Sequence, residues 1–326
     1  MKKGIMLFAA LVSLAACGKQ DVSEEKETIV SETEVSETVV SDTVSSSSVQ
    51  SEEANGVEVS WNVIPEEGIV SGDYYKISER FRQGHEGILE VIVKEDQLEY
   101  VYFNEYTRPN YYNRYFQNVS KRMSEYNVSM KEAKGAAWIE GVLSAEAQIM
   151  ENQSLTEDIE TVSGASNSIE QALVPLAEKL NAEIVPSKDF NGPTFYQITK
   201  YLDNGINGIL KVVVENKKII DLHYDEVFSN DPNNISEAKD KRYAGLSKYD
   251  SVEYDEPSRI GFNVQMDELT KHVLENQDML NIEGLPATED TGDYKKAGYT
   301  KRNPAWDHYL ELAEELKTLA ESEGKL

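Results

Sequence analysis

The sequence GILEVIV at residues 87–93 returns as GILKVVV at residues 208–214, and this repeat decides the fold that we expect. Six of twenty positions are identical between residues 87–106 and residues 208–227. Each copy continues through a short polar segment, Glu95-Asp96 or Glu215-Asn216, into a second run rich in strand-forming residues. Two such runs around a short turn predict a β-hairpin. The repeat therefore predicts two copies of one α+β unit.

The similarity between the copies continues after both hairpins. Lys-Arg at 121–122 is matched by Lys-Arg at 241–242, Ser-Glu-Tyr-Asn at 124–127 by Ser-Lys-Tyr-Asp at 247–250, and Glu-Asn-Gln at 151–153 by Glu-Asn-Gln at 275–277. Both copies end in similar helical sequences, at 176–180 and 312–316. We expect two tandem domains, at 56–185 and 186–326. Each has an antiparallel hairpin sheet, a long helix, a loop and a final helix.

The N-terminus has the form of a lipoprotein signal peptide. Lys2 and Lys3 precede an apolar run over residues 5–16, which is too short to span a bilayer and leads into Leu-Ala-Ala-Cys-Gly at 14–18. We expect residues 1–16 to be removed and Cys17 to become a diacylglyceryl thioether at the new N-terminus; a free cysteine in an ordinary secretory signal is the alternative. Cys17 is the single cysteine of the chain, so we expect no disulfide.

Residues 17–55 have the composition of a disordered stalk. The segment is built from Ser, Thr, Glu and Val, and it has ten acidic residues against Lys19 and Lys26. It contains no aromatic ring and cannot form a hydrophobic core. We expect it to lift the folded part away from a membrane, which fits a Gram-positive surface, although a linker that serves only solubility has the same composition.

Residues 160–166, Glu-Thr-Val-Ser-Gly-Ala-Ser, lie between two predicted helical segments. Gly164 and Ala165 leave space beside a hydroxyl, that of Ser166, which directly precedes the amphipathic run at 169–180. One interpretation is a phosphate site, because a helix N-terminus favours an anion. The other is an ordinary helix start in which Ser166 or Ser168 is the N-cap.

The same segment resembles the acceptor motif of FMN-binding domains, in which an acidic residue is followed, after two positions, by Ser/Thr-Gly-Ala-Thr/Ser. The resemblance implies covalent FMN, whose phosphate is esterified by a flavin transferase to the last hydroxyl, here that of Ser166. The other motif residues are Glu160, Ser163, Gly164 and Ala165. Glu160 and Ser166 stand where the family prefers Asp and Thr, but they keep the carboxylate and the hydroxyl.

The second copy departs from this motif. It has Glu-Gly-Leu-Pro-Ala-Thr at 283–288, which is one residue shorter and lacks the glycine before alanine. Thr288 is its natural candidate acceptor, and Thr300, within the insertion at 289–303, is a rival. Pro286 restricts the backbone where a transferase would enter. Either the second copy carries a second FMN, or it has kept the fold and lost the cofactor.

Other chemistries have little support in the sequence. The four histidines, His85, His223, His272 and His308, stand singly and without the spacing of zinc ligands, so we expect them to be surface or hairpin residues. A formal charge of −27 excludes simple binding to nucleic-acid phosphates and gives no attraction to an anionic lipid surface. Aromatic residues of the first copy offer rings for stacking on a flavin, although strand aromatics more often belong to a core. They are Tyr102, Phe103, Tyr106, Tyr111, Tyr112, Tyr115 and Phe116.

The tandem arrangement resembles a double FMN-binding-domain surface lipoprotein over nearly everything after the stalk. This family includes flavin-bearing subunits of the Rnf and sodium-pumping quinone reductases and lipoproteins of extracellular electron transfer in Gram-positive bacteria. The resemblance implies a lipid-anchored, extracytoplasmic redox carrier rather than a stand-alone enzyme. It implies that electrons come from a membrane quinol-linked dehydrogenase and pass to extracellular acceptors.

Two further interpretations stay open. In one, both domains lack a cofactor and the chain is a ligand-binding or adhesive surface lipoprotein. In the other, the apolar segment at residues 7–16 is trimmed to a secreted peptide pheromone, as in some similar lipoproteins of Gram-positive bacteria. The same composition serves any signal peptide.

Overall fold

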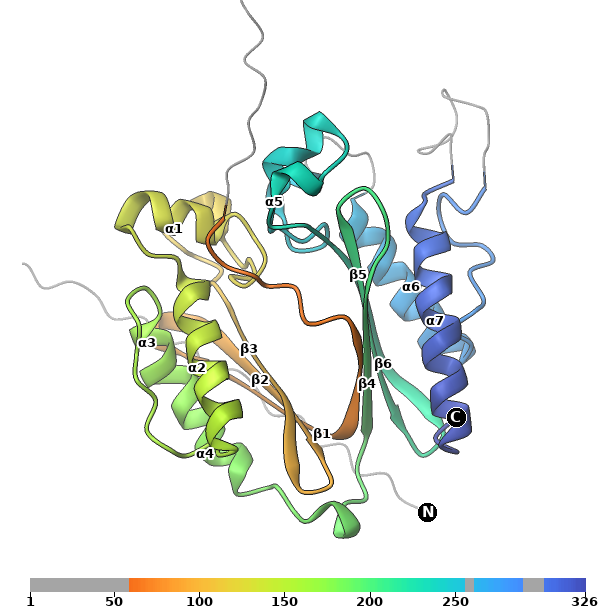
Figure 1. Cartoon of the computed structure of the whole chain (residues 1–326), viewed down its shortest axis with the longest axis horizontal. Helices are drawn as coiled ribbons and strands as arrows, with labels where there is room; N and C mark the ends of the chain where they lie inside the picture. The colour runs from red at the N-terminus through yellow and green to blue at the C-terminus, as the bar shows by residue number, and fades with distance from the viewer. Residues whose placement is uncertain (1–58, 256–260, 290–301) are drawn as a thin grey trace, which may run out of the picture. The chain divides into compact units, whose positions relative to one another are not determined.

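The computed structural model describes residues 59–255, 261–289 and 302–326. The expected signal peptide, Cys17, the expected stalk and Thr300 lie outside the described residues. The described chain is α+β, with a six-stranded antiparallel sheet and several helices (Figure 1). The α+β class predicted from the sequence is confirmed.

The strands of both copies share one sheet, in the order β3-β2-β1-β4-β5-β6. The bounds are β1 Gly68–Phe81, β2 His85–Lys94, β3 Gln97–Tyr106, β4 Thr194–Tyr201, β5 Ile206–Glu215 and β6 Lys218–Phe228. The sequence predicts a separate hairpin sheet in each of two tandem domains, and this two-domain arrangement is not confirmed, because one sheet holds the strands of both copies. The pairing of β1 with β4 joins the two hairpins.

Strand β1 changes its main partner half-way along. Residues 68–73 pair with β4, whereas residues 73–81 pair with β2. Gly72 lies at this change, where a Cβ atom would be 2.5 Å from the backbone oxygen of Val93. Glycine allows this close approach of two strands. We call strands β1–β3 the first wing of the sheet and strands β4–β6 the second wing. In Figure 1 the two wings diverge from the junction of β1 and β4.

Both predicted hairpins are present. The first turns at Glu95-Asp96, as expected, and the second turns at Asn216-Lys217, one residue later than the expected Glu215-Asn216. All four turn residues have positive φ, between 51° and 65°. Such turns match the right-handed twist of the strands that they join.

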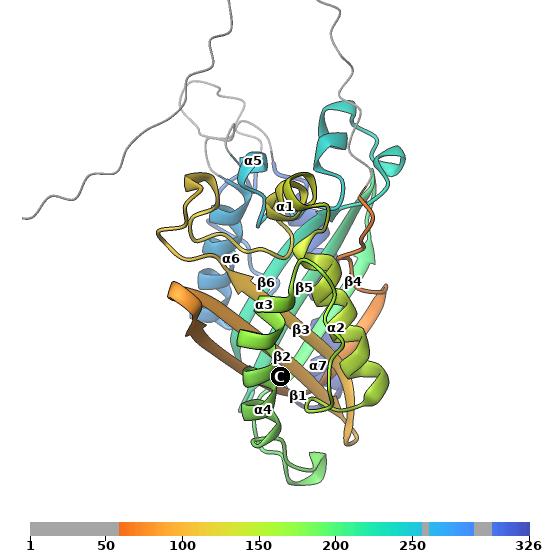
Figure 2. The ribbon, with the colours of Figure 1, turned by 90° about the vertical axis from the view of Figure 1, so that its left-hand side faces the viewer.

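The helices cover the outer faces of the two wings (Figures 1 and 2). Helices α2 and α4 pack on β1–β3, and α6 and α7 pack on β4–β6. Each wing has its own hydrophobic cluster, with Trp138 at 1% exposure in the first and Trp306 at 0% in the second. The bounds are α1 Tyr126–Lys134, α2 Trp138–Asn152, α3 Ser166–Ser168, α4 Val174–Asn181, α5 Val252–Asp255, α6 Phe262–Asn276 and α7 Ala305–Ser322. A π-helical turn, Ile169–Leu173, joins α3 to α4.

The ends of α2 and α6 confirm one expected correspondence between the copies. Gln153 and Gln277 each follow the helix in a left-handed conformation. The Gln153 side chain accepts from the backbone N–H of Leu98 at 2.8 Å and donates to its carbonyl at 3.1 Å. Gln277 makes the same pair of bonds to Ile219, at 2.8 and 3.0 Å.

Another expected correspondence is wrong. Ser120 bridges to Tyr106 at the end of β3, and Ser247 bridges to Val227 at the end of β6. The next residues, Lys121 and Lys248, each pair with a buried glutamate on those strands. Lys121 therefore corresponds to Lys248 and not to Lys241, because the second loop is longer by a 3₁₀ segment, Ala238–Tyr243, whose residues have no counterpart in the first copy.

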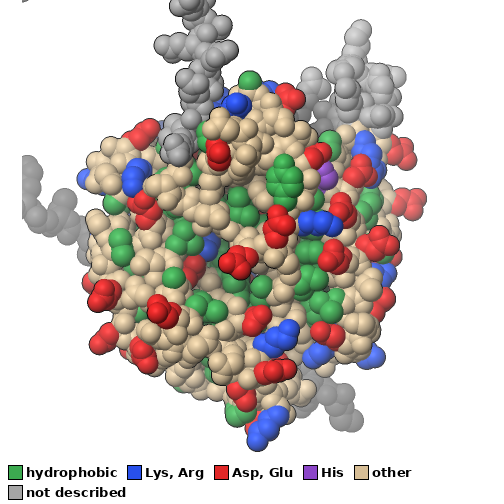
Figure 3. All heavy atoms as spheres, viewed as in Figure 1, with side chains coloured by type: hydrophobic (Ala, Val, Ile, Leu, Met, Phe, Trp, Pro, Cys, Tyr) green, Lys and Arg blue, Asp and Glu red, His purple; other side chains and the backbone are tan. Residues whose placement is uncertain are grey.

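No helix among the described residues is both long and apolar enough to cross a membrane. Acidic side chains are spread over the face shown in Figure 3, mixed with lysines and arginines. This face has no single-sign patch that would mark a binding surface for a macromolecule.

Candidate functional site

The loop before helix α3 is packed tightly against the start of α2. Gly164 has φ +105°, and a Cβ atom on it would lie 2.7 Å from the backbone oxygen of Ala137. Ala165 is 1% exposed, and a Cβ atom on Gly141 would lie 2.7 Å from the Ala165 methyl group. Packing alone thus requires a glycine and a small residue at positions 164 and 165.

Ser166 is the first residue of α3 and is partly exposed. Its Oγ atom donates only to the carbonyl of Val162, at 3.3 Å. The N-cap residue of α3 is Ala165, which makes no side-chain cap hydrogen bond. The interpretation of Ser166 or Ser168 as an N-cap is therefore wrong, because both lie inside the helix. The Ser168 hydroxyl instead accepts from Trp138 Nε1 at 2.9 Å.

The other motif residues lie on the surface of the same loop. Glu160 and Ser163 are exposed. The backbone N–H of Glu160 donates to Gln148 Oε1 at 2.8 Å, and its carbonyl accepts from Gln148 Nε2 at 3.0 Å. No hydrogen bond or ion pair of the Glu160 carboxylate occurs within the described part of the chain. The motif is thus an ordered and accessible loop.

A cavity of about 240 Å³ opens beside the start of this helix. We call it the first-repeat cavity. Asn167 and Ser168 form one side of it, and Tyr111 and Tyr112 form another. The two tyrosine rings lie 4.4 Å apart between centroids, and Tyr112 is 81% exposed. The cavity therefore has a solvent-facing aromatic wall next to the helix that begins at Ser166.

A buried carboxylate forms the base of the first-repeat cavity. Glu105 is 2% exposed and pairs with Lys121, and its Oε1 atom lies 2.9 Å from His85 Nδ1. Burial alone would raise the pKa of Glu105, but His85 and Lys121 hold it below its usual value. Glu105 Oε2 and Arg108 Nε are buried without a hydrogen-bond partner in this structure. An acceptor and a donor are thus available to a ligand.

The second copy has a comparable cavity, of about 260 Å³. Glu226 forms its base and pairs with Lys248 Nζ at 2.5 Å and with His308 Nδ1 at 2.8 Å. Burial alone would raise the pKa of Glu226, but Lys248 and His308 lower it to about 2. His308 comes from α7, whereas His85 comes from β2. The equivalent glutamates of the two copies, Glu105 and Glu226, therefore pair with histidines from different elements. No local sequence pattern indicates this difference.

Thr288 lies in a different setting from Ser166. Its Oγ1 atom donates to the carbonyl of Leu285 at 3.1 Å, and its own carbonyl accepts from Arg302. Ala287, which stands where the motif has alanine, has φ +57°, and Pro286 before it takes the place of the glycine. Helix α7 begins only at Ala305. The structure thus places Ser166, and not Thr288, at the start of the helix that closes its repeat.

The aromatic residues divide among three places. Tyr111 and Tyr112 line the first-repeat cavity, whereas Tyr102 and Tyr106 line a third cavity on the inner face of the sheet. Phe103 and Phe116 are buried in the hydrophobic core. Tyr115 lies outside the core and is 37% exposed.

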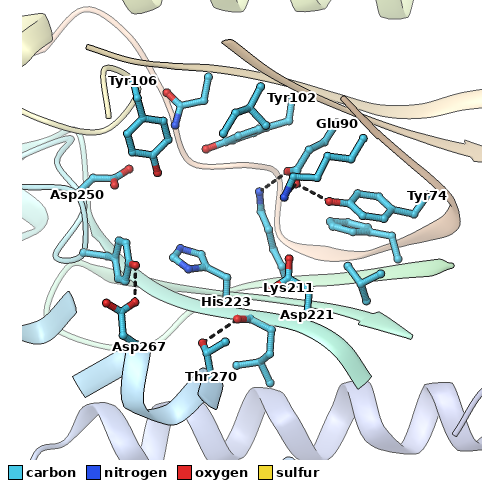
Figure 4. A pocket seen from close by; sticks show the side chains of 17 residues that line it. Tyr74, Glu90, Tyr102, Tyr106, Lys211, Asp221, His223, Asp250, Asp267 and Thr270 are labelled. Atoms are coloured by element: carbon cyan, nitrogen blue, oxygen red, sulfur yellow. Dashed lines mark hydrogen bonds and ion pairs between the residues drawn. The ribbon is translucent and has the colours of Figure 1, made fainter. Parts of the chain in front are cut away.

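The third cavity, which we call the central cavity, measures about 280 Å³ and takes side chains from both copies (Figure 4). Its walls include Lys76 and Glu90 of the first wing and Lys211 and His223 of the second. Burial and the Lys211 charge lower the pKa of His223 to about 4. His223 lies on the hairpin strand β6, as expected, and it also lines this cavity. No group of three or more potential metal ligands occurs within residues 59–255, 261–289 and 302–326.

Comparisons with known proteins add little to this geometry. No protein-family model matches the chain, and no curated protein matches it. The crystal structure of the CPE2226 protein from Clostridium perfringens is similar at 26% identity, over 35% of this chain and 90% of that protein. The TM-score is 0.28, which is too low to carry a conclusion about fold or function.

Proposed function

We propose that this chain is a lipid-anchored, extracytoplasmic flavoprotein that carries FMN on Ser166 and transfers electrons. The observation that carries the proposal is the position of Ser166. Its hydroxyl is partly exposed, is not used as a helix cap, and begins the helix that borders a cavity with an aromatic wall. The resemblance of residues 160–166 to the acceptor motif of FMN-binding domains supports the same assignment.

The first-repeat cavity fits the chemistry of a flavin ring. Such a ring presents both hydrogen-bond donors and acceptors at its edge and an apolar face. Glu105 Oε2 and Arg108 Nε, both buried and without partners, match the edge, and the Tyr112 ring matches the face. The bound cofactor would supply the one- and two-electron redox chemistry. The protein would hold and orient it.

A covalent bond is useful to a protein outside the cell membrane. A cofactor that dissociates there is diluted into the surroundings, whereas a phosphoester holds it until the bond is hydrolysed. Formation of this bond joins the Ser166 oxygen to the flavin phosphorus and breaks the phosphoanhydride bond of a flavin dinucleotide donor, so that the nucleoside monophosphate and the hydroxyl proton leave. The step needs a flavin transferase as a partner. Gly164 and Ala165 keep the loop free of bulky side chains next to the hydroxyl.

The remaining parts of the proposal concern the membrane anchor, the stalk, the electron-transfer partners and the domains. Cys17 would anchor the chain to the extracytoplasmic face of the membrane, and residues 17–55 would form the stalk. A membrane quinol-linked dehydrogenase would be the electron donor, and metal ions, soluble flavins or a reductase domain would be acceptors. Each copy of the repeat would be one FMN-binding-like domain, at 56–185 and 186–326.

A second flavin on Thr288 is the other part of this proposal. Thr288 has a hydroxyl, but its loop has Pro286 in place of the glycine and does not lead directly into a helix. Mass analysis of the second copy therefore decides between one and two flavins per chain.

The direct test replaces Ser166 by alanine in the full chain, expressed together with a flavin transferase in a host that exports it. The expected result is loss of the fluorescent band after denaturing electrophoresis, with an unchanged circular dichroism spectrum. Ser163→Ala is the matched control, because Ser163 is exposed in the same loop but is not the acceptor. A fluorescence yield unchanged by Ser166→Ala, with no flavin on Thr288 or Thr300, would exclude Ser166 as the attachment site.

A second candidate is a surface lipoprotein that binds a ligand without any cofactor. The central cavity favours it, because that cavity is separate from Ser166 and adjoins a smaller cavity in which Gln197 Oε1 has no hydrogen-bond partner. Absence of flavin from protein isolated from its own cell surface would select this candidate. Release of a pheromone from residues 7–16 is compatible with either function and is tested with synthetic peptides from that segment.

A further inference from the structure

The central cavity combines parts that neither copy of the repeat supplies alone. Figure 4 shows Tyr102 and Glu90 from the first wing facing Lys211 and His223 from the second. Because these residues come from strands on both sides of the β1–β4 junction, the cavity exists only in the joined sheet. It shares none of its lining with the first-repeat cavity beside Ser166.

One end of the central cavity is already satisfied internally. Glu90 is 8% exposed, and its oxygens lie 3.4 Å from Lys76 Nζ and 3.5 Å from Lys211 Nζ. Tyr74 donates its hydroxyl proton to Glu90 Oε1 at 2.6 Å. Lys211 Nζ also lies 3.8 Å from the centre of the Tyr102 ring. Two lysines and one glutamate leave this end with a net positive charge, so it does not attract a further cation.

The opposite end contains two carboxylates, and the Lys211 charge acts on one of them, that of Asp250. Asp250 Oδ2 accepts from Ser120 Oγ at 2.8 Å. Asp225 is 4% exposed, and its Oδ1 atom accepts the backbone N–H groups of Glu226 at 2.7 Å and Tyr249 at 3.1 Å. Neither aspartate makes an ion pair with any residue in the described ranges. Burial raises the pKa of Asp225 to about 7 and that of Asp250 to about 6.

A small extension of about 30 Å³ lies between these two aspartates and strand β4, and we call it the floor cavity. It shares Tyr102, Lys211, His223 and Asp250 with the central cavity. Gln197 also lines it and is 1% exposed, yet its Oε1 atom has no hydrogen-bond partner. A buried acceptor without a partner costs about 1–3 kcal/mol and is rare in folded proteins. The floor cavity thus contains one buried acceptor, Gln197 Oε1, that lacks a donor.

We propose that the central cavity binds a small organic amine, whose primary ammonium group enters the floor cavity and donates to Gln197 and to the carboxylates of Asp225 and Asp250. A primary ammonium group offers three donors and a positive charge; Gln197 Oε1 lacks a donor, and neither aspartate has an ion-pair partner among the described residues. The cavity is large enough for a group of this size, because a water molecule needs only about 10–15 Å³. The larger part of the central cavity takes the apolar stem, and the Tyr106 ring in Figure 4 faces this space.

The inference goes beyond the flavin proposal and does not depend on it. The amine site uses the inner face of the sheet, and the flavin site uses the end of the first wing. Loss of flavin in Ser166→Ala therefore leaves amine binding unchanged, and loss of amine binding leaves the flavin in place.

The test is calorimetric titration of the full chain with n-pentylamine at pH 8. Two matched compounds separate charge from hydrogen bonding: 1-pentanol lacks the charge, and pentyltrimethylammonium keeps the charge but has no N–H donor. The expected result is that each binds at least about tenfold more weakly than n-pentylamine. Equal binding of 1-pentanol, or no binding of n-pentylamine up to about 10 mM, would overturn the proposal and leave a water molecule as the occupant of the floor cavity.

Variants of the lining residues test whether the ammonium group lies in the floor cavity. Asp250→Asn is expected to weaken n-pentylamine binding at least about tenfold while its amide oxygen can still accept from Ser120. Gln197→Leu is expected to weaken binding as well and to melt no lower than the native chain, because it removes an unpaired buried acceptor. Glu99→Gln is the control, because Glu99 is an exposed carboxylate of β3 outside the cavity lining. Folded Asp250→Asn and Gln197→Leu proteins that bind n-pentylamine as tightly as Glu99→Gln would contradict the assignment.

Discussion

Glu90 and Lys211 occupy the same position in the two copies of the repeat, and their charged atoms face each other at 3.5 Å across the joined sheet. Each is the only charged residue in its seven-residue copy, GILEVIV or GILKVVV. Burial alone would raise the pKa of Glu90, but Lys211 and Lys76 hold it below its usual value. The two copies have thus acquired opposite charges where their inner faces meet.

Breaking this pair is expected to destabilise the protein. Glu90→Gln leaves Lys211 buried without its partner, and we expect a loss of about 2–4 kcal/mol in the free energy of unfolding. The measurement is urea denaturation at pH 7. Glu311→Gln is the control, because Glu311 pairs with Lys200 on the surface, at 54% and 39% exposure, and is expected to cost less than about 1 kcal/mol. Equal losses in both variants would mean that Glu90 and Lys211 do not stabilise the joined sheet.

The loop before Ser166 is expected to tolerate no side chain at position 164. Gly164→Ala combines positive φ with a contact of 2.7 Å to the Ala137 oxygen, and we expect it to cost about 2–4 kcal/mol. Gly135→Ala is the matched control, because Gly135 has φ +76° but no atom within 4 Å of its added Cβ. The control is expected to cost about 1 kcal/mol, from backbone strain alone. Thermal unfolding of both variants measures the difference, and similar melting temperatures would show that the loop is not packed as described.

Asp225 is expected to make stability depend on pH. Its pKa is raised to about 7 in the folded chain, above about 3.9 in an unfolded chain, so the folded state holds a proton that the unfolded state has released. This contribution is fully present below the unfolded pKa and is lost as pH rises through about 7. Asp225→Asn is therefore expected to raise stability at pH 8 by about 2 kcal/mol and to have little effect near pH 4.

Urea denaturation at both pH values checks this prediction. The groups that act on the Asp225 carboxyl are the Asp250 carboxylate, the Ser247 hydroxyl and the backbone N–H groups of Tyr249 and Glu226. Asp221→Asn is the control, because Asp221 lies on the same strand and is partly exposed. A stability difference between Asp225→Asn and the native chain that is the same at pH 4 and pH 8 would show that Asp225 does not titrate in this range.

Trp138 is expected to hold the start of helix α3 in place. Trp138→Phe removes the donor to Ser168 Oγ and leaves a small cavity, and we expect a loss of about 2–4 kcal/mol. Ser168→Ala removes the acceptor alone and is expected to cost about 1–3 kcal/mol, because the indole N–H then lacks a partner. A double variant that costs clearly less than the sum of the two single changes would confirm the contact; additive costs would refute it.

The elements that the sequence predicted well are those with local patterns. The hairpins follow from strand-forming runs around two-residue turns, and the segments matched at 151–153 and 275–277 occupy equivalent places in the two copies. The union of the sheet could not be predicted, because residues 68–73 and 194–199 pair over a long separation and have no shared local motif. The expected match of Lys121 with Lys241 was wrong because the second loop contains an additional 3₁₀ segment, Ala238–Tyr243, which the local sequence pattern does not reveal.

The site could be predicted in part. The motif at 160–166 placed a hydroxyl at a helix start, and the structure shows that helix start and a cavity beside it. The central cavity was missed, although one signal was available: a single charged residue in each apolar strand, Glu90 and Lys211, with opposite signs. A charge in an otherwise apolar strand needs a partner, and each copy of the repeat held the partner of the other.

The most direct test of the central claim is mass spectrometry of the peptide that contains Ser166, from protein isolated from its own cell surface. The account predicts a mass increase equal to FMN less one water on this peptide, with fragment ions that place it on Ser166. A peptide of unmodified mass, in protein that is folded and intact from Cys17 onward, would contradict the claim that this chain carries a flavin at the start of helix α3.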